Sequence, residues 1–263
     1  MPELPEVETV VRSIAPHITG QKIVAASVLS HRVTRGDHAQ TASQLTNARI
    51  LAVRRRGKQI LIDLDKGLLY VHLGMTGKLL WNGRSGKYTR AFLEFKNGTL
   101  LFDDIRTFGR FEFFSAPPAN LTNVGPDALV VSFEEFYSRM RKRKGSLKVL
   151  LLNQSFIAGV GNIYADEALF AARIHPLARS GRLSERRARV LYESLGEVLA
   201  LAIEHRGSSI SDYVDGAGEQ GSFQSLHNVY GRQGETCLRC EGTIRRIVVA
   251  QRGTHYCPRC QRV

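Results

Sequence analysis

Hydrophobic residues recur every three or four positions near the start of the chain. They are Val7, Val10, Val11, Ile14 and Ile18, a spacing that places them on one face of an α-helix. Glu6 and Glu8 fall in its first turn, where the helix dipole favours negative charge. The pattern predicts a helix over residues 6–18 that buries one face against the rest of the protein.

The pattern then changes to short apolar and alternating runs, which are typical of β-strands. These runs cover residues 22–30, 49–54, 59–65, 67–75, 90–95 and 99–104. Asn97-Gly98 separates the last two runs and is a common two-residue hairpin turn. We therefore expect residues 1–115 to form a β-rich domain, either a sandwich or a barrel, with the leading helix packed on it.

Helical spacing returns in the second half of the chain. Residues 116–130 contain three prolines and little periodicity, which indicates a linker. Ser132 and Glu135 have the spacing of a capping box and predict a helix that ends near Arg143. Further helices are expected over residues 147–153, 163–174 and 184–205. Residues 131–225 are thus predicted to form a helical domain, and the chain as a whole an α+β protein.

Two segments of this helical part are rich in glycine. Gly159 and Gly161 allow close backbone approach, and Asn162 follows them at a helix start. Such a turn offers backbone N–H groups and a side-chain amide to phosphate oxygens. Residues 206–222 are rich in Gly, Ser and Asp, which predicts an irregular, mobile loop.

The charge balance points to a polyanionic partner. The 263 residues include 37 Lys and Arg against 24 Asp and Glu, a formal net charge of +13. Such a field suits nucleic acid. No run of about 18 apolar residues predicts a membrane span, and no basic amphipathic helix indicates a membrane-surface role. Without a signal-peptide pattern, we expect a cytoplasmic protein.

All four cysteines lie near the C-terminus, as Cys237-x2-Cys240 and Cys257-x2-Cys260 separated by sixteen residues. Each two-residue gap lets a turn aim both sulfurs at one point, and the intervening segment is long enough for a hairpin. The alternatives are two disulfides or a redox pair, which a reducing compartment disfavours. We predict one structural zinc ion in a ribbon over residues 229–263, whose arginine-rich surface suits phosphates.

Two further basic runs, residues 54–58 and 139–148, are in isolation typical of solvated faces. Together with the ribbon and the glycine turn they outline a nucleic-acid surface.

The terminal Met1-Pro2-Glu3 offers different chemistry, because removal of Met1 exposes a secondary amine on a rigid ring. An α-amine titrates near 8, so a useful fraction is nucleophilic near neutrality. The alternative is a stiff lead-in to the helix.

Six separated motifs closely resemble bacterial formamidopyrimidine-DNA glycosylases over essentially the whole chain. The motifs are Met1-Pro-Glu-Leu-Pro-Glu-Val-Glu-Thr9, His72-Leu-Gly-Met-Thr-Gly77, Asp104-Ile-Arg-Thr-Phe-Gly109, Gly159-Val-Gly-Asn-Ile-Tyr-Ala-Asp-Glu167, Val229-Tyr-Gly-Arg-Gln-Gly-Glu235 and Thr254-His-Tyr-Cys-Pro-Arg-Cys260. The resemblance implies a helix-two-turn-helix around the glycine turn, and a monomer that binds damaged duplex DNA. It implies excision of oxidised purines and strand cleavage by β,δ-elimination.

The resemblance also implies roles for individual residues. Pro2 would be the Schiff-base nucleophile and Glu3 its acid/base partner, while Lys58 and Arg252 would assist the eliminations. The implied DNA contacts are Met75, Arg90, Arg106, Phe108, Lys144 and Asn162. The family's loop that closes over the extruded base would be residues 216–224. Lys87-Tyr-Thr-Arg90 departs from the His-rich segment of many relatives.

Two other functions compete with this one. A DNA-binding protein of the same fold that has lost catalysis would lack Pro2, Glu3 or Lys58, and all three are present. A glycosylase for oxidised pyrimidines is the other alternative. The sister family usually opens with Pro-Glu-Gly-Pro-Glu, so Leu4 favours the purine-directed branch.

Overall fold

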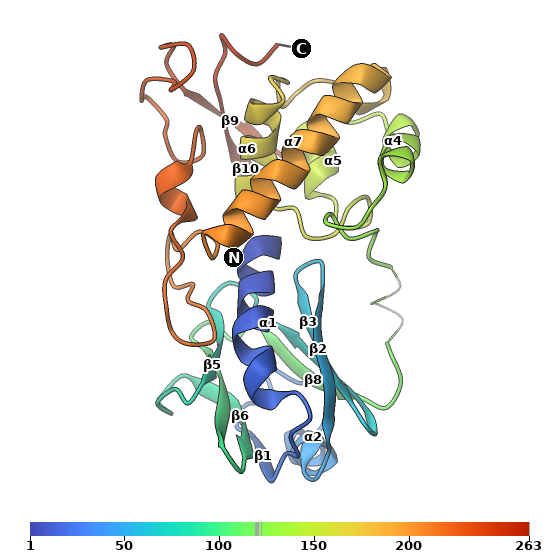
Figure 1. Cartoon of the computed structure of the whole chain (residues 1–263), viewed down its shortest axis with the longest axis vertical. Coiled ribbons are helices and arrows are strands. Elements are labelled where there is room, and N and C mark those ends of the chain that lie inside the picture. The colour runs from blue at the N-terminus through green and yellow to red at the C-terminus, as the bar shows by residue number, and fades with distance from the viewer. Residues whose placement is uncertain (119–120, 122, 263) are drawn as a thin grey trace. The chain divides into compact units, whose positions relative to one another are not determined.

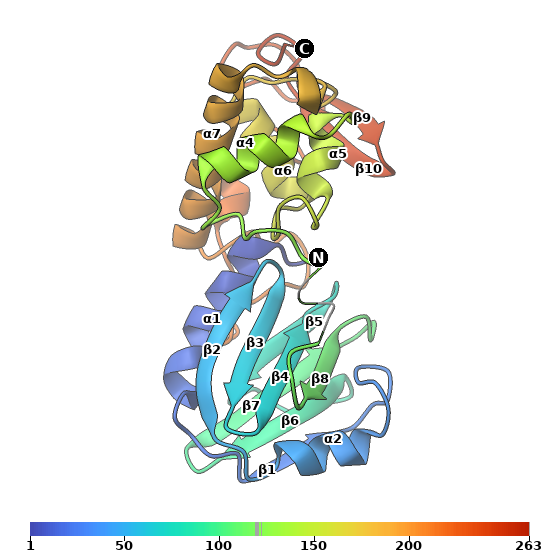
Figure 2. The same ribbon diagram turned by 90° about the vertical axis from the view of Figure 1, so that its right-hand side faces the viewer.

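A computed structural model describes residues 1–118, 121 and 123–262, and parts of the chain group into two compact units (Figures 1 and 2). The first unit comprises Met1–Thr122 and His205–Gln224, and the second comprises Asn123–Glu204 and Ser225–Val263. The sequence-based boundaries keep residues 131–225 together, whereas the structure groups 205–224 with the first unit. Part of the proposed linker, at residues 119, 120 and 122, lies outside the described residues.

The first unit is a sandwich of two antiparallel four-stranded sheets, with strand orders β1-β6-β7-β5 and β2-β3-β4-β8. The strands are β1 (Ala25–Val28), β2 (Ile50–Arg56), β3 (Gln59–Leu64), β4 (Gly67–His72), β5 (Gly77–Trp81), β6 (Thr89–Phe95), β7 (Gly98–Asp104) and β8 (Arg110–Phe114). This settles the choice between sandwich and barrel. Helix α1 (Leu4–Ile18) buries its predicted apolar face in the core that both sheets share.

Some local predictions need correction. The hairpin between β6 and β7 turns at Lys96-Asn97, because Gly98 already pairs with Phe95. The pattern did not predict β5, β8 or the helix α2 (His38–Leu45), in which only Thr41 and Leu45 are buried. A short helix with so little apolar surface leaves almost no periodic signal.

The second unit is helical and ends in a two-stranded ribbon. Its helices are α4 (Phe133–Arg141), α5 (Leu147–Leu152), α6 (Asn162–Ala171) and α7 (Glu185–Glu204), with a short 3₁₀ turn η1 (Ser180–Arg182). A second 3₁₀ turn, η2 (Phe223–Leu226), spans the boundary between the two units at residues 224 and 225. Strands β9 (Arg245–Val249) and β10 (Arg252–Tyr256) pair antiparallel between the two cysteine pairs. In the part of the chain that the structure describes, none of the helices has the length and apolarity to cross a membrane.

The segment 206–222 is irregular, as expected, but it is also anchored to α1. Tyr213 donates its hydroxyl hydrogen bond to the Glu6 carbonyl oxygen at 3.2 Å, and the Gly216 N–H donates to Ser13 Oγ at 2.9 Å. Hydrogen bonds therefore fasten this segment, which was predicted to be mobile, to the helix.

Candidate functional site

The N-terminal end of α1 fixes the direction of Pro2 and Glu3. Glu3 is the N-cap residue and forms a reciprocal capping box with Glu6, whose Oε2 accepts the Glu3 N–H at 2.7 Å. The other oxygen of Glu6 accepts the Ser208 N–H at 2.8 Å. Pro2 and Glu3 are both buried. Unlike a frayed terminus, this one is held by hydrogen bonds from the helix and from the 206–222 loop.

Lys58 lies at the tip of the β2–β3 hairpin in the same unit. Gly57 precedes it with φ +58°, a left-handed conformation that glycine adopts readily. Arg55 joins this tip to α1, because its guanidinium donates to Glu8 Oε2 at 2.8 Å and to the Gly57 carbonyl oxygen at 3.0 Å. Helix α1 and the turn that carries Lys58 are thus tied to each other.

His72 faces the same hairpin from β4, where it pairs with Gln59. Burial lowers the pKa of His72, and the nearby charges of Lys58 and Arg110 lower it further. Its Nδ1 accepts the Gly74 N–H at 3.1 Å. The ring is therefore neutral near pH 7, with its proton on Nε2.

Met75, Arg106 and Phe108 form a cluster that we call the wedge. One Arg106 nitrogen lies 3.3 Å from Met75 Sδ, and the Arg106 guanidinium lies 4.7 Å from the centre of the Phe108 ring. Met75 is 42% exposed and Phe108 55% exposed, although both are apolar. The structure thus brings together the three side chains that the resemblance assigned to filling the DNA helix.

Asp104, to which the sequence analysis assigned no role, holds the wedge in place through hydrogen bonds. Its fully buried carboxylate accepts hydrogen bonds from Thr76 Oγ1 at 2.6 Å, from the Arg106 N–H at 3.2 Å and from the Gly109 N–H at 2.8 Å. Its carbonyl oxygen accepts from Arg90 Nε at 2.8 Å. Arg90, a predicted DNA contact, therefore also supports the wedge.

Asp104→Asn should loosen the wedge. The carboxylate of Asp104 accepts hydrogen bonds on both oxygens, and the amide of asparagine would place an N–H group against one of these donors, so that a hydrogen bond is lost. We expect a loss of about 1–3 kcal/mol in the free energy of unfolding. Binding to a duplex with an abasic-site analogue should weaken as well, measured by fluorescence anisotropy. Asp103→Asn is the matched control, and an equal effect in both variants would contradict the role of Asp104.

Asn162, in the second unit, joins the glycine turn to the ribbon. It is the first residue of α6, and its Nδ2 donates to the Gly253 carbonyl oxygen at 2.9 Å. Gly159, three residues earlier in the turn, has φ +103°, a backbone conformation that favours glycine. Its Oδ1 is buried and has no hydrogen-bond partner among the described residues. One of the two N–H donors of the Asn162 side chain is thus engaged in positioning β10, and Asn162 stays a predicted DNA contact.

A buried ion pair holds the same elements together. Lys148 and Asp166 have fully buried side chains, and Lys148 Nζ lies 2.6 Å from Asp166 Oδ1. Lys148 also donates to the Asn162 carbonyl oxygen at 2.9 Å, and Asp166 Oδ2 accepts the His255 N–H at 2.8 Å. Helices α5 and α6 and strand β10 therefore share one polar network, which presents exposed Arg252 at the start of β10.

Glu167 and Lys144 contrast in their surroundings. The buried Glu167 carboxylate accepts backbone N–H groups from Asn228, Val229 and Tyr230 at 2.8–2.9 Å, which fixes the segment leading into the ribbon. Lys144 is exposed in the α4–α5 connection and lines a hollow with arginines from that connection and from η1. Lys144 is accordingly available to an external phosphate.

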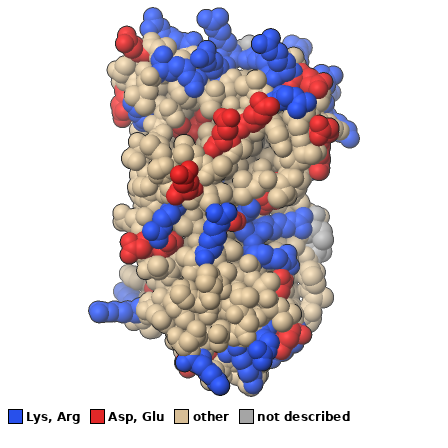
Figure 3. All heavy atoms as spheres, in the orientation of Figure 1, with Lys and Arg blue, Asp and Glu red and all other residues tan. Residues whose placement is uncertain are grey.

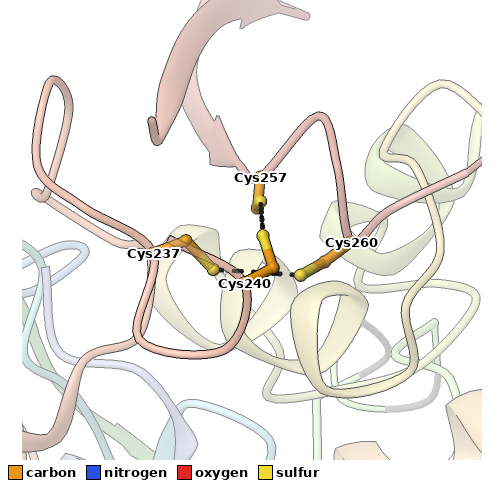
Figure 4. A group of neighbouring side chains, drawn as sticks. All are labelled: Cys237, Cys240, Cys257 and Cys260. Carbon is orange, nitrogen blue, oxygen red and sulfur yellow. Dashed lines mark hydrogen bonds between the residues drawn. The ribbon is translucent and has the colours of Figure 1, made fainter. Parts of the chain in front are cut away.

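The four cysteines converge on one point (Figure 4), and all four are free. Their sulfurs lie within 4.8 Å of one another, with 3.8 Å between Cys237 and Cys260 and 3.4 Å between Cys240 and Cys257. A tetrahedral zinc site with Zn–S bonds of about 2.3 Å separates its sulfurs by roughly 3.8 Å. The Gly242 N–H lowers the pKa of Cys240, whereas burial raises the pKa of Cys257 and of Cys260. The cluster fits a structural zinc ion.

Removal of zinc by a chelator should unfold the ribbon, because its cluster of buried residues is mainly Phe170, Val229, Ile244 and the cysteines themselves. We expect DNA affinity to fall at least about tenfold, since Arg252 loses its place, while the first unit keeps its β-sheet circular dichroism. Unchanged DNA binding with an unfolded ribbon would contradict this role.

Three family models match successive parts of the chain. The formamidopyrimidine-DNA glycosylase N-terminal domain matches residues 1–111, and the corresponding H2TH domain matches residues 124–214. A zinc finger found in FPG and IleRS matches residues 234–263.

Full-length proteins match as well. The chain is 53% identical to the formamidopyrimidine-DNA glycosylase of Solibacter usitatus and 42% identical to that of Carboxydothermus hydrogenoformans, with all of each chain covered. Among solved structures, a Lactococcus lactis FPG mutant in complex with DNA containing Fapy-dG aligns with a TM-score of 0.90 at 35% identity, over 100% of both chains. The MutM (FPG) protein of Thermus thermophilus aligns with a TM-score of 0.89 at 42% identity, over 99% of this chain and 98% of that one. The chain therefore belongs to the formamidopyrimidine-DNA glycosylase family.

Proposed function

We propose that this protein removes oxidised purines from duplex DNA and then cleaves the strand at the abasic site. The observation that carries the proposal is the terminus held at the start of α1, where the Glu3–Glu6 capping box fixes Pro2 in the unit that also holds Lys58. Membership of the glycosylase family supports the same activity.

Pro2 would act as the nucleophile once Met1 is removed. Its secondary amine attacks C1′ of the damaged nucleotide, and the C1′–N bond breaks as the base leaves. Opening of the sugar ring gives an iminium ion, which has no N–H proton to lose and so keeps its positive charge. That charge acidifies the C2′ proton, and Glu3 is placed to manage protons around the sugar.

Two eliminations would follow from the iminium ion. Loss of the C2′ proton expels the 3′ phosphate, and a second elimination expels the 5′ phosphate. The strand is left with a one-nucleotide gap that carries phosphate at both ends. Lys58 and Arg252 would neutralise the negative charge that develops on the leaving phosphates.

The wedge would assist extrusion of the damaged nucleotide. Taking a base out of the stack costs a few kcal/mol. Met75 and Phe108 are exposed apolar groups, so stacking them into the vacated space would offset part of this cost. Arg106 lies between them and would contact the backbone or the orphaned base. The 216–224 segment, which starts where Gly216 bonds to α1, would close over the extruded base.

We further propose that the protein works as a monomer in the cytoplasm of a bacterium. The full-length relatives are bacterial proteins. The net charge of +13 would attract DNA over distances of about a Debye length.

A strand-cleavage assay tests the proposed function. Duplexes carrying a formamidopyrimidine, 8-oxoguanine or an oxidised pyrimidine are incubated with the protein, and the products are resolved by gel electrophoresis and mass. We expect base release and phosphate at both ends of the gap for the purine lesions. Cleavage of the pyrimidine lesion alone would redirect the substrate assignment, and no cleavage of any duplex would overturn the proposal.

A further inference from the structure

Five arginines surround a hollow of about 650 Å³ beside Cys240 and Cys260 of the zinc cluster. They are Arg173, Arg187, Arg239, Arg259 and Arg262. Among the described residues, those that line the hollow include no carboxylate, and none of the five arginines forms an ion pair. Lys and Arg side chains gather over the end of the second unit that holds the C-terminus (Figure 3).

The hollow lies away from the residues assigned to the damaged DNA within the second unit. Strand β10 runs along α6, with Gly253 bonded to Asn162 at the N-terminal end of the helix and His255 bonded to Asp166 one turn later. The cysteines follow at the C-terminal end, where Phe170 packs against Cys257. Ten helical residues span about 15 Å, so Arg252 and the hollow lie at opposite ends of α6.

Internal contacts use only part of the donor capacity of these arginines. Arg239 donates to the Phe170 carbonyl oxygen at 3.0 Å and lies 4.3 Å from the centre of the Phe170 ring. Arg259 donates to the Cys240 carbonyl oxygen at 3.3 Å. Arg187 donates to the Arg262 carbonyl oxygen at 3.0 Å. Each guanidinium has five N–H donors, so most remain available, and the carbonyl contacts hold Arg187, Arg239 and Arg259 in place.

The local charge remains positive when zinc is included. Four thiolates and one Zn²⁺ ion carry a net charge of −2, which must be counted in any electrostatic argument. The five guanidinium groups exceed it by three positive charges. The arginines are therefore more numerous than neutralisation of the metal cluster requires.

We propose that this hollow binds the phosphate backbone of a second duplex DNA segment while damaged DNA occupies the other end of α6. The lining consists of arginines and two cysteines, and arginine forks match phosphate oxygens in a bidentate geometry. Protein–protein interface cores are enriched in aromatic residues, and the described residues that line the hollow include no aromatic side chain. Holding two segments lets the protein pass from one DNA region to another. The inference does not depend on the chemistry at Pro2.

The test saturates the protein with an unlabelled duplex that contains a tetrahydrofuran abasic analogue, and then titrates a labelled undamaged duplex. Anisotropy should report a ternary complex. Arg173→Gln/Arg262→Gln removes two charges whose side chains make no hydrogen bond among the described residues, so the fold should persist. We expect affinity for the second duplex to fall at least about fivefold. The slope of log K against log salt should become less steep by about 1.8, because two phosphate contacts are lost.

The control variant Lys96→Gln/Arg186→Gln removes the same net charge at exposed positions outside the hollow. It should bind the second duplex as the parent does, and both variants should bind the first duplex unchanged. Absence of a ternary complex, or equal losses in the two variants, would overturn the inference. If the hollow binds polyglutamate more tightly than the second duplex, the proposed occupant is wrong and an acidic protein takes the place of DNA. Failure to bind the first duplex would count against the proposed function. Titration of the labelled undamaged duplex would still test the hollow, because the comparison of the two variants does not depend on the first duplex.

Discussion

Pro2→Ala should lower the overall rate of base excision and strand cleavage at least about 100-fold. Alanine leaves a primary amine at the terminus, and the iminium that it forms can lose its N–H proton and with it the charge that drives elimination. Alanine also lacks the rigid ring that limits the motion of the nitrogen next to Glu3, the N-cap residue of α1. Single-turnover kinetics on a formamidopyrimidine duplex would measure the loss.

Binding separates this effect from damage to the fold. The DNA contacts that we propose lie in the wedge, at Lys58 and in the second unit, so Pro2→Ala should bind an abasic-analogue duplex within about threefold of the parent. A variant that excises the base at the parental rate would show that another group is the nucleophile. A variant that loses binding and excision together would show that Pro2 mainly supports the fold.

Asp166→Asn should cost the second unit roughly 3–5 kcal/mol in its free energy of unfolding. The substitution leaves the Lys148 ammonium without its counter-charge at a site where both side chains are fully buried. It also weakens the acceptor for His255, which fixes β10. Urea denaturation followed by circular dichroism would measure the change.

Two comparisons make this prediction specific. Asp166→Asn with Lys148→Met removes both charges and should recover part of the lost stability, because a neutral pair avoids the burial of an unpaired ion. Asp63→Asn breaks the partly exposed Arg54–Asp63 pair and should cost at most about 1 kcal/mol. A loss below about 1 kcal/mol in Asp166→Asn would contradict the assigned role of the buried pair.

The sequence alone predicted the elements with a strong periodic signal. The apolar face of α1 and the long helix α7 have enough turns for the pattern to repeat, and the cysteine spacing is a local signal that needs no tertiary contact. The start of α4 was also predicted, since Ser132 caps it through the Glu135 N–H. The resemblance, and not the periodicity, supplied the candidate catalytic and DNA-contacting residues.

Long-range polar contacts could not be predicted in this way. Asp104 meets Thr76 across 28 positions of the sequence, and Asp166 meets His255 across 89. Neither contact leaves a pattern within a short window. The grouping of residues 205–224 with the first unit could not be predicted for the same reason. It depends on contacts of Ser208 and Tyr213 with Glu6, near the start of the chain.

The central claim is that the amine of Pro2 attacks the damaged nucleotide. Borohydride reduction during reaction with a formamidopyrimidine duplex traps the iminium as a stable covalent adduct, and peptide mass mapping locates it. We predict a single adduct on the N-terminal peptide, at the nitrogen of Pro2 in protein that has lost Met1. An adduct on Lys58 or on any other amine, or no adduct with a duplex that the protein cleaves, would contradict the account.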